Sequence, residues 1–344
     1  PMRGSEVRDP RIWAHYLSDA MERFGDEAEV LVCQHHWPIH GREEILDFLA
    51  RQRDLYKHVH DQAVRRMNLG WRPQEIAEAA DLPPSLRRDW RMRGYYGSAA
   101  HNAKAVFQRY LSWYDGNPAN LAPLPPKQGA AKHLEYMGGA GAVLARARAD
   151  FEAGEFRWVA QVLQHVLVAE PRNAAARGLA ADAFEQLGYQ AENATWRNAY
   201  LYAAQELREG VVTLPPRPIL PPDLLEAAET ETLFDFMAVR LDAEAATGLH
   251  RRIDWAFPER GETVAQTLRH ETLTQILGKR RADADAVATL PRDVFVALLV
   301  RRISVAEAVV SGYMAVEGDV GAVEALFDML DDFELQFDVV APSA

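Results

Sequence analysis

The chain has 344 residues with 50 acidic and 38 basic side chains, which gives a formal net charge of −12 at pH 7. This acidic balance argues against a general nucleic-acid binder, because such a protein needs a basic stripe on its surface. Its single cysteine, Cys33, excludes an internal disulfide and a thiolate metal site. No stretch of the sequence reaches the ~18 consecutive apolar residues of a transmembrane helix.

The sequence begins at Pro1 without the basic and apolar regions of a secretory signal. We expect a processed, truncated or incomplete product. The compartment stays open: a longer parent with a signal would be periplasmic or secreted, and one without a signal would be cytoplasmic.

The first part of the chain combines helices with one short strand. Apolar side chains recur at helical spacing over residues 10–24, and the apolar run 29–33 predicts a short buried strand. A loop with the sequence QHHWP follows at 34–38. A long helix is expected over 42–68, closed by Gly70.

Helix follows helix with short breaks from about residue 41 to 210. The apolar spacing predicts helices over 98–114, 128–152, 155–169, 173–187 and 193–209. The last three have the spacing of tetratricopeptide-like (TPR-like) hairpins, although three helices do not establish a repeat array. We expect a helical packing module that can pack against a second copy of itself.

Five prolines between 211 and 222 favour an extended connector and mark the clearest domain boundary. Beyond it, two short helices around 223–245 precede a mixture of strands and helices. The expected strands are 250–257, 263–268, 273–276, 285–290 and 312–317, and the expected helices are 291–300, 304–310 and 319–331. The chain is therefore predicted to be mostly α, with a C-terminal α+β domain.

The histidine pair His35-His36 is the most informative local feature. A loop that follows a strand can place an imidazole at the carboxyl edge of a sheet, where sites of α/β proteins gather. Zinc usually needs at least three protein ligands, and nothing shows that His15 or His40 faces the same point. Two interpretations stay open: one corner of a metal site, or a surface or hydrogen-bonded histidine pair.

Three other groups carry possible chemistry. Arg3 and Arg8 could grip a tetrahedral oxyanion through paired N–H donors, or they could be exposed arginines at a frayed end. The segment 93–97, with two glycines around two tyrosines, predicts a closely packed turn before His101; its hydroxyls could orient a substrate or plug two helices together. The motif 58–61 (HVHD) lies in the long helix, where positions i and i+2 point apart, so it predicts surface hydrogen bonding.

Several motifs stand in an order that resembles one known family. They are Arg3-Gly4 with Arg8-Asp9, His35-His36-Trp37-Pro38, Gln52-Arg53-Asp54 with His60-Asp61-Gln62, Arg93-Gly94-Tyr95-Tyr96-Gly97, His101-Asn102-Ala103-Lys104-Ala105-Val106, Gln108-Arg109-Tyr110, Trp113-Tyr114-Asp115-Gly116-Asn117-Pro118, Arg157-Trp158-Val159-Ala160, Glu185-Gln186-Leu187-Gly188-Tyr189-Gln190, Gly312-Tyr313-Met314 and Glu317-Gly318-Asp319. Together they resemble the dodecyl sulfate-hydrolysing alkyl sulfatases of the metallo-β-lactamase superfamily.

The resemblance implies a domain plan. Residues 1–40 would be the end of a metallo-β-lactamase-like α/β catalytic domain, and 41–210 an all-helical dimerisation domain. Residues 211–222 would be the linker, and 223–344 a sterol-carrier-like (SCP2-like) domain. A homodimer is implied as well.

The resemblance also implies site residues. His35 would be a ligand of a binuclear zinc site, with His36 as the alternative. Arg3 and Arg8 would hold the sulfate group of an alkyl sulfate. Tyr96, His101 and Tyr110 would be catalytic candidates that line the site from the helical domain.

One departure from the family matters. The family's His-x-His-x-Asp-His motif and bridging carboxylates precede everything seen here and are absent from this sequence. Two hypotheses follow. The chain is the C-terminal part of a zinc-dependent alkyl sulfatase, inactive alone, or it is a non-catalytic helical dimer that carries a domain for binding a lipid or alkyl chain.

Overall fold

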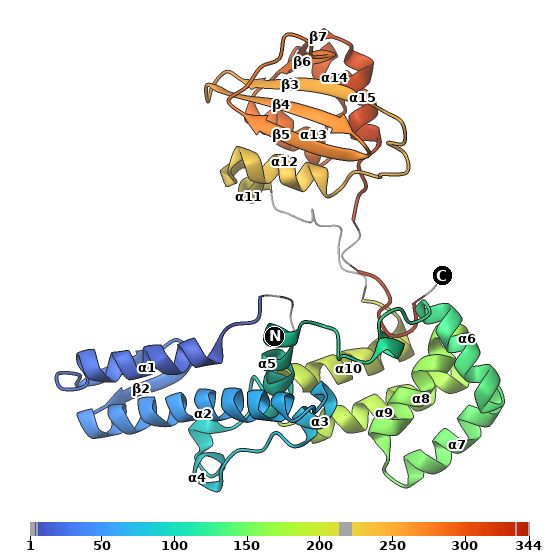
Figure 1. The fold of residues 1–344 in the computed structure, drawn as a ribbon. Coiled ribbons are helices and arrows are strands. Elements are labelled where there is room, and N and C mark those ends of the chain that lie inside the picture. The colour runs from blue at the N-terminus through green and yellow to red at the C-terminus, as the bar shows by residue number, and fades with distance from the viewer. Residues whose placement is uncertain (1–3, 5, 213–221, 334–335, 343–344) are drawn as a thin grey trace. The chain divides into compact units, whose positions relative to one another are not determined.

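The computed structural model describes residues 4, 6–212, 222–333 and 336–342. The chain divides into two compact units, shown in Figure 1. Unit 1 comprises Pro1–Val211 with Asp338–Ala344, and unit 2 comprises Val212–Phe337. Most of the proline-rich connector predicted at 211–222 therefore lies outside the described residues.

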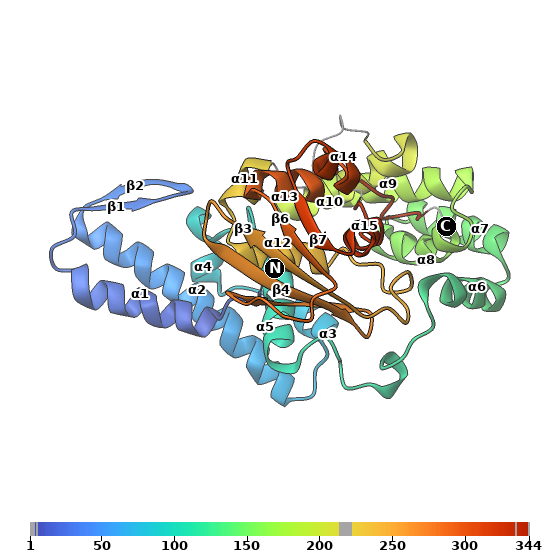
Figure 2. The same cartoon turned by 90° about the horizontal axis from the view of Figure 1, so that it is seen from above.

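Unit 1 begins with an antiparallel pair of helices and a small hairpin. Helix α1 (Pro10–Phe24) packs along the long helix α2 (Arg42–Asn68), and the Asp9 side chain caps α1. Between them the chain forms strands β1 (Val30–Cys33) and β2 (His36–His40), which pair antiparallel and are seen beside α2 in Figure 2. The expected loop at 34–38 is thus mostly a second strand. Pro38 is tolerated there because β2 belongs to a two-stranded sheet with free edges.

Short elements then lead to the rest of unit 1. They are α3 (Pro73–Glu78), α4 (Pro84–Arg87), the 3₁₀ turns η1 (Trp90–Met92) and η2 (Pro118–Asn120), and α5 (Ala99–Leu111). Helix α5 packs against both α2 and α3. Its buried Val106 and Phe107 join Ile76 of α3 and Ala63 of α2 in one apolar cluster.

Five helices complete unit 1. They are α6 (Pro126–Met137), α7 (Ala140–Glu152), α8 (Phe156–Ala169), α9 (Ala174–Gln190) and α10 (Ala194–Glu209). The apolar face of α8 is buried against α6, α7 and α9, and α9 packs on α10. The single helix expected over 128–152 is wrong, because Gly138 and Gly139 both have φ near +88°, a left-handed conformation that ends α6.

Unit 2 is built on a five-stranded sheet with the strand order β5-β4-β3-β6-β7. The strands are β3 (Arg251–Phe257), β4 (Glu262–Arg269), β5 (Thr272–Leu277), β6 (Ala286–Thr289) and β7 (Ala315–Gly318). The helices are α11 (Pro222–Ala227), α12 (Thr230–Ala238), α13 (Arg292–Leu299), α14 (Val305–Val310) and α15 (Val320–Asp328). Only β3 and β6 pair in parallel, with Ile253 opposite Ala286.

Aromatic rings fill the interior of unit 2. The ring of Phe295 on α13 lies 5.1 Å from both Phe234 and Trp255, and 5.4 Å from Phe257. All four side chains are fully buried. The prediction of a mostly helical chain with a small sheet region near its C-terminal end is confirmed.

The chain returns to unit 1 after unit 2. Ala341 is buried in the core formed by α6 to α10. The carboxylate of Glu206, on α10 and only 2% exposed, accepts hydrogen bonds through Oε1 from the backbone N–H groups of Val339 (2.9 Å) and Val340 (2.7 Å). Residues 338–342 therefore belong to the helical unit, although the sequence predicts a C-terminal domain that includes them.

Candidate functional site

The hairpin separates the two histidines of the QHHWP segment. His35 is exposed in the turn between β1 and β2, whereas His36 begins β2 and is half-buried. The ring of His36 stacks on Trp90, with ring centroids 5.4 Å apart, and lies 5.3 Å from the ring of Phe48. The two candidate metal ligands therefore stand in very different surroundings.

The hydrogen bonds of His36 determine which nitrogen is free. Its Nδ1 lies 2.7 Å from the carbonyl oxygen of Trp37, and a carbonyl only accepts, so Nδ1 carries the proton. Nε2 then has a free lone pair, is buried, and meets no partner among the described residues. Metal-binding histidines commonly have this arrangement, with the second nitrogen held by a carbonyl. The geometry favours His36 over His35 as a metal ligand.

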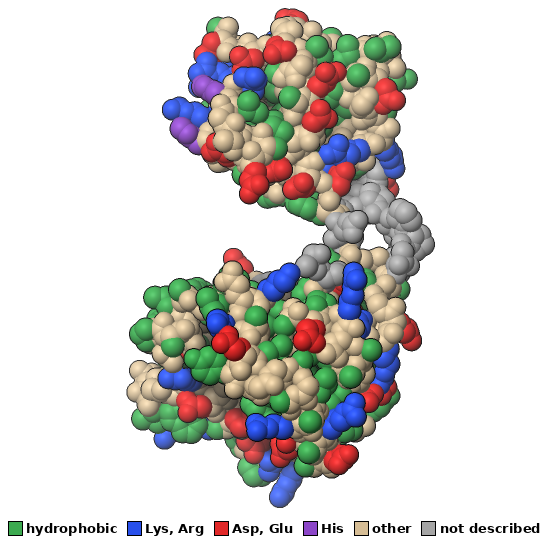
Figure 3. Space-filling model, turned by 90° about the vertical axis from the view of Figure 1, so that its right-hand side faces the viewer, with side chains coloured by type: hydrophobic (Ala, Val, Ile, Leu, Met, Phe, Trp, Pro, Cys, Tyr) green, Lys and Arg blue, Asp and Glu red, His purple; other side chains and the backbone are tan. Residues whose placement is uncertain are grey.

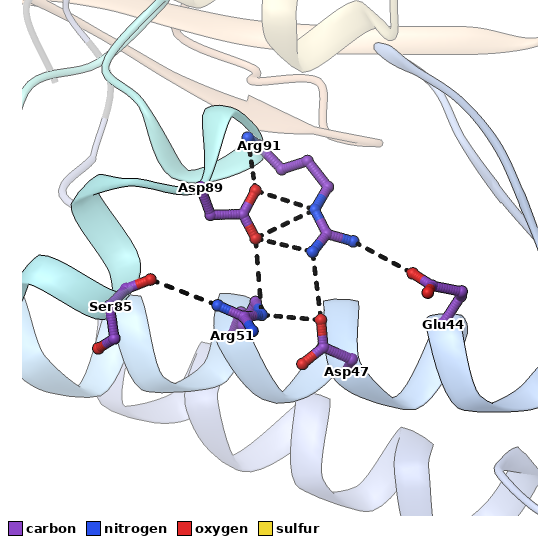
Figure 4. Close-up of polar contacts among 6 residues, drawn as sticks. All are labelled: Glu44, Asp47, Arg51, Ser85, Asp89 and Arg91. Carbon is purple, nitrogen blue, oxygen red and sulfur yellow. Dashed lines mark hydrogen bonds and ion pairs between the residues drawn. The ribbon is translucent and has the colours of Figure 1, made fainter.

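An ion-pair network holds Trp90 in place over His36. Arg91 donates to Asp89 (2.7 Å) and to Asp47 of α2 (3.2 Å), and Arg51 bonds Asp47 at 2.7 Å, as Figure 4 shows. The bond from Arg51 is the main reason that the pKa of Asp47 is lowered, and the bond from Arg91 does the same for Asp89. Both carboxylates are thus ionised at neutral pH, and the turn η1 is fixed to α2.

The segment 93–97 forms the closely packed turn that the sequence predicts. A Cβ on Gly94 would lie 2.6 Å from the carbonyl oxygen of Gly97, so no larger residue fits there without movement. The carbonyl of Tyr95 accepts from the N–H of Ala194 (2.8 Å) and that of Tyr96 from the hydroxyl of Thr195 (3.1 Å). The turn is therefore anchored to the N-terminus of α10.

His101 lies directly behind this turn, in the first turn of α5. Ser98 caps the helix and contacts the His101 ring, which also lies 5.9 Å from the ring of Trp196. Burial lowers the pKa of His101, with the charge of Lys104 adding to it. The imidazole is therefore neutral near pH 7. Tyr96 itself is largely exposed.

Tyr110, at the other end of α5, is hydrogen-bonded to a histidine of α2. Its hydroxyl lies 2.8 Å from Nε2 of His60, and Nδ1 of His60 lies 2.8 Å from Oδ1 of Asp61. His60 is only 6% exposed. The prediction of surface hydrogen bonding for the motif 58–61 is therefore wrong for His60, because α5 covers it.

Arg8 lies near the same part of α2. Burial raises the pKa of Tyr56, and the nearby charge of Arg8 partly opposes that rise. Arg109 of α5 donates to the carbonyl of Val7 (2.7 Å) and pairs with Asp9 (3.4 Å), which holds the chain on both sides of Arg8. Arg3, the second predicted sulfate-binding arginine, lies outside the described residues.

The structure brings the candidate residues to three places rather than one. His36 touches α2 at Phe48, whereas Tyr110 touches it at His60, twelve positions or about 18 Å further along the helix. Tyr96 and His101 lie together at the start of α5. The helical unit therefore presents a histidine corner, a separate tyrosine–arginine corner, and the pair Tyr96 and His101 at the other end of α5.

The residues present do not complete a zinc site. Within the described part of the chain, no three histidine, cysteine or carboxylate side chains converge on one point. A catalytic zinc ion takes about three protein ligands, and His36 offers one free nitrogen. A zinc ion at this corner would need ligands beyond the described residues.

Sequence reasoning missed the partners that position these residues. Trp90 drew no attention, because it acts through its contact with His36, which is distant in the sequence. Arg109 appeared only as part of a motif, and its contact with Val7 is equally distant. His60 could have been found from its spacing: it follows Tyr56 by four positions, which puts both on one face of α2.

Unit 1 carries charged side chains of both signs on its surface. On the face drawn in Figure 3, basic and acidic side chains of unit 1 alternate between hydrophobic patches. Among the described helices, none is both long enough and apolar enough to span a bilayer.

Comparison with known proteins identifies the class. The family model described as alkyl sulfatase dimerisation matches residues 72–210, and the one described as alkyl sulfatase C-terminal matches residues 218–342. The chain belongs to the alkyl sulfatase family.

Its relatives show how much of the length of the family's proteins this chain covers. It is 48% identical over 341 residues to the alkyl/aryl-sulfatase BDS1 of Saccharomyces cerevisiae, covering 99% of this chain and 52% of that protein. A linear primary-alkylsulfatase of Pseudomonas sp. is 40% identical, with 99% and 51% covered. The solved structure of the stereoselective inverting sec-alkylsulfatase Pisa1 from Pseudomonas sp. is 40% identical, with a TM-score of 0.94, 99% of this chain and 54% of that chain covered. The chain thus spans about half the length of the relatives it matches.

Proposed function

We propose that this chain is the C-terminal part of a zinc-dependent alkyl sulfatase that hydrolyses linear alkyl sulfate esters, such as dodecyl sulfate, to alcohol and sulfate. The observation that carries the proposal is the match of 99% of the chain to alkyl sulfatases at 40–48% identity. The acidic net charge does not attract an anionic ester, so local arginines must neutralise the sulfate group. Arg8, held in place by Arg109, is the described candidate.

The zinc site of this proposal is shared between this chain and residues outside it. His36, or His35 as the alternative, contributes one ligand. The free and buried Nε2 of His36 supports this role. Zinc, when bound, would supply Lewis-acid polarisation of the ester or of water. The chain alone is expected to bind zinc weakly and to be inactive.

A homodimer through unit 1 is part of the proposal. The family model that matches residues 72–210 is described as a dimerisation domain, which supports it. Exposed aromatic side chains within this range, such as Tyr136 and Trp158, offer apolar surface for a partner copy. Sedimentation should give a dimer, and a monomer at all concentrations would contradict this part.

The alternative, a non-catalytic dimer that binds an alkyl chain in its C-terminal domain, needs an apolar cavity in unit 2. The aromatic side chains around Phe295 occupy the described interior instead. A groove of about 320 Å³ between α12 and β5 carries Asp235 and Glu271 in its lining. Carboxylates at that groove do not favour an alkyl chain.

Two measurements test the proposed function. Dodecyl sulfate hydrolysis and zinc content are measured for residues 1–344 alone and for a longer protein that contains them. We expect turnover and zinc only in the longer protein. Stoichiometric tightly bound zinc with turnover in the chain alone would show that no further residues are needed.

Arg8→Ala, compared with Arg11→Ala, tests the sulfate-binding role in the longer protein. Arg11 is a matched control because it is exposed on the first turn of α1 and pairs only loosely with Asp9 (3.9 Å). We expect a raised KM for the Arg8 variant alone.

A further inference from the structure

A hydrogen-bonded chain of three residues crosses the contact between α2 and α5. It runs from the Asp61 carboxylate through the His60 ring to the Tyr110 hydroxyl, and both links measure 2.8 Å. The central imidazole is buried, whereas the Tyr110 side chain is 46% exposed. The chain therefore connects a buried base to a phenol that solvent or a ligand can reach.

The chemistry of the end groups determines where the protons lie. Although burial opposes it, the bonds from Lys57 and His60 lower the pKa of Asp61, so its carboxylate is ionised and only accepts hydrogen bonds. His60 must then donate from Nδ1 to Asp61. In the neutral ring, Nε2 then carries the lone pair and accepts the O–H of Tyr110. The Tyr110 hydroxyl therefore donates its hydrogen to His60, and its oxygen can accept a further hydrogen bond from another group.

The candidate anion-binding residue lies on the same side of α2. The positive charge of Arg8 acts on the pKa of Tyr56. Tyr56 precedes His60 by one helical turn, and residues four apart on a helix are neighbours. Arg109, the residue before Tyr110, fixes the backbone next to Arg8. The backbone next to Arg8 is therefore held at the end of α5 that carries Tyr110.

We propose that Asp61, His60 and Tyr110 form a proton relay that accepts a proton from the water attacking an alkyl sulfate ester held at Arg8. This inference rests on the proposed function. As the water oxygen bonds to the ester, one of its O–H bonds breaks and the proton passes to the Tyr110 oxygen. The original Tyr110 proton passes to Nε2 of His60. The ester bond breaks with its electron pair on the leaving oxygen: sulfate leaves as its dianion, whereas an alkoxide takes up a proton from solvent to give the alcohol. The imidazolium formed is stabilised by Asp61.

The direction of the relay is a consequence of the Asp61 contact. With a neutral His60 protonated on Nδ1, Nε2 can only receive a proton, so the relay acts as a base. After the reaction, His60 returns the proton through Tyr110 to solvent. Asp61 is a positioning residue here, because it holds the tautomer of His60 and does not touch the ester.

The first test is the tautomer of His60, measured by ¹⁵N NMR on histidine-labelled residues 1–344. We expect an unprotonated Nε2, and we expect Tyr110→Phe to shift the His60 signals. His58 is the control, because it lies in the same helix and contacts only the carbonyl of Asp81 (3.1 Å), so its signals should not change. A protonated Nε2 would mean that His60 donates to Tyr110, and would overturn the relay.

The second test uses the longer sulfatase-active protein. Tyr110→Phe should lower kcat by about a hundredfold or more with little change in KM, as the loss of a general base does. Asp61→Asn, a change at a half-exposed side chain that should leave folding intact, should lower kcat as well, whereas His58→Asn should not. Wild-type kcat in Tyr110→Phe would overturn the relay. Absence of ester hydrolysis by the wild-type protein would instead contradict the proposed function.

Discussion

The imidazole rings of His133 and His165 lie face to face between α6 and α8, with centroids 4.1 Å apart and planes only 8° from parallel. Nδ1 of His133 donates to the carbonyl of Gly129 at 2.7 Å. Burial lowers the pKa of His165, and the charge that His133 can carry lowers it further. Two protonated rings at this distance would repel each other, so the contact depends on pH.

The sign of this dependence follows from the lowered pKa. The unfolded chain binds protons at His165 more readily than the folded one, so unfolding becomes easier as pH falls below about 6.5, the usual value for histidine. The stabilisation is complete above that pH. It is lost progressively as pH falls from there to the lower pKa that His165 has in the folded chain. An NMR titration should place the His165 pKa below about 6.5, the usual value for histidine. His133→Gln should move it towards the ordinary value, and an unchanged value would contradict the stacking effect.

Arg91→Ala should destabilise the region that supports His36. The variant leaves Asp89 without its main partner and weakens the hold on Asp47. Loss of hydrogen bonds to charged groups of this kind costs about 1.5–3 kcal/mol. Urea unfolding measures the loss, and Arg88→Ala, at an exposed neighbouring arginine, should change stability little.

The same network gives an acid dependence. The pKa values of Asp47 and Asp89 are lower in the folded chain than in the unfolded chain. Their contribution to stability is therefore complete above the pKa of the unfolded chain and is lost as pH falls through the pKa of the folded chain. The difference in unfolding free energy between wild type and Arg91→Ala should therefore shrink below about pH 4. A difference that stays constant with pH would show that Arg91 acts by packing alone.

Glu206→Leu should release residues 338–342 from unit 1. The substitution removes the acceptor of two backbone N–H groups, whereas Glu206→Gln keeps a carbonyl oxygen in the same position. We expect carboxypeptidase to trim the Leu variant faster than wild type, with the Gln variant close to wild type. Glu209→Leu, on the exposed side of α10, is the matched control, and equal trimming of all four proteins would contradict the contact.

Two glycine substitutions should act in opposite directions. Gly94→Ala forces a Cβ to within 2.6 Å of the Gly97 carbonyl and should destabilise the tyrosine turn. Gly178 lies in α9 with open space around its Cβ position, so Gly178→Ala should stabilise the chain by about 0.5–1 kcal/mol. Thermal unfolding measures both, and the same sign for the two would contradict this account.

Periodicity predicts most of this fold and little of the candidate site. The bounds of α2 follow from apolar spacing because α2 buries one face, and the strands β3 and β4 follow from their runs of buried residues. The break between α6 and α7 was missed because the apolar spacing continues across Gly138 and Gly139. Strand β2 was missed because its side chains are mostly exposed, so a histidine- and proline-bearing segment carries no strand pattern.

The site depends on contacts that no local pattern contains. His60 meets Tyr110 fifty positions away, and the tyrosine turn is held by α10, about a hundred positions further along the chain. Arg109, for example, gains its role only when α5 meets the segment around Val7. The resemblance to alkyl sulfatases pointed to Tyr96, His101 and Tyr110 but carried no information on the groups that orient them.

The return of the chain to unit 1 at Asp338 makes unit 2 an insertion within the helical unit and not an appendage at its end. A single proteolytic cut in the first connection would leave unit 2 attached through the second. The exchange of C-terminal domains between alkyl sulfatases, by recombination or by design, is constrained in the same way. A transplant that begins after α10 and runs to the end also carries the residues that satisfy Glu206, so donor and recipient must match at that carboxylate as well as at the junction.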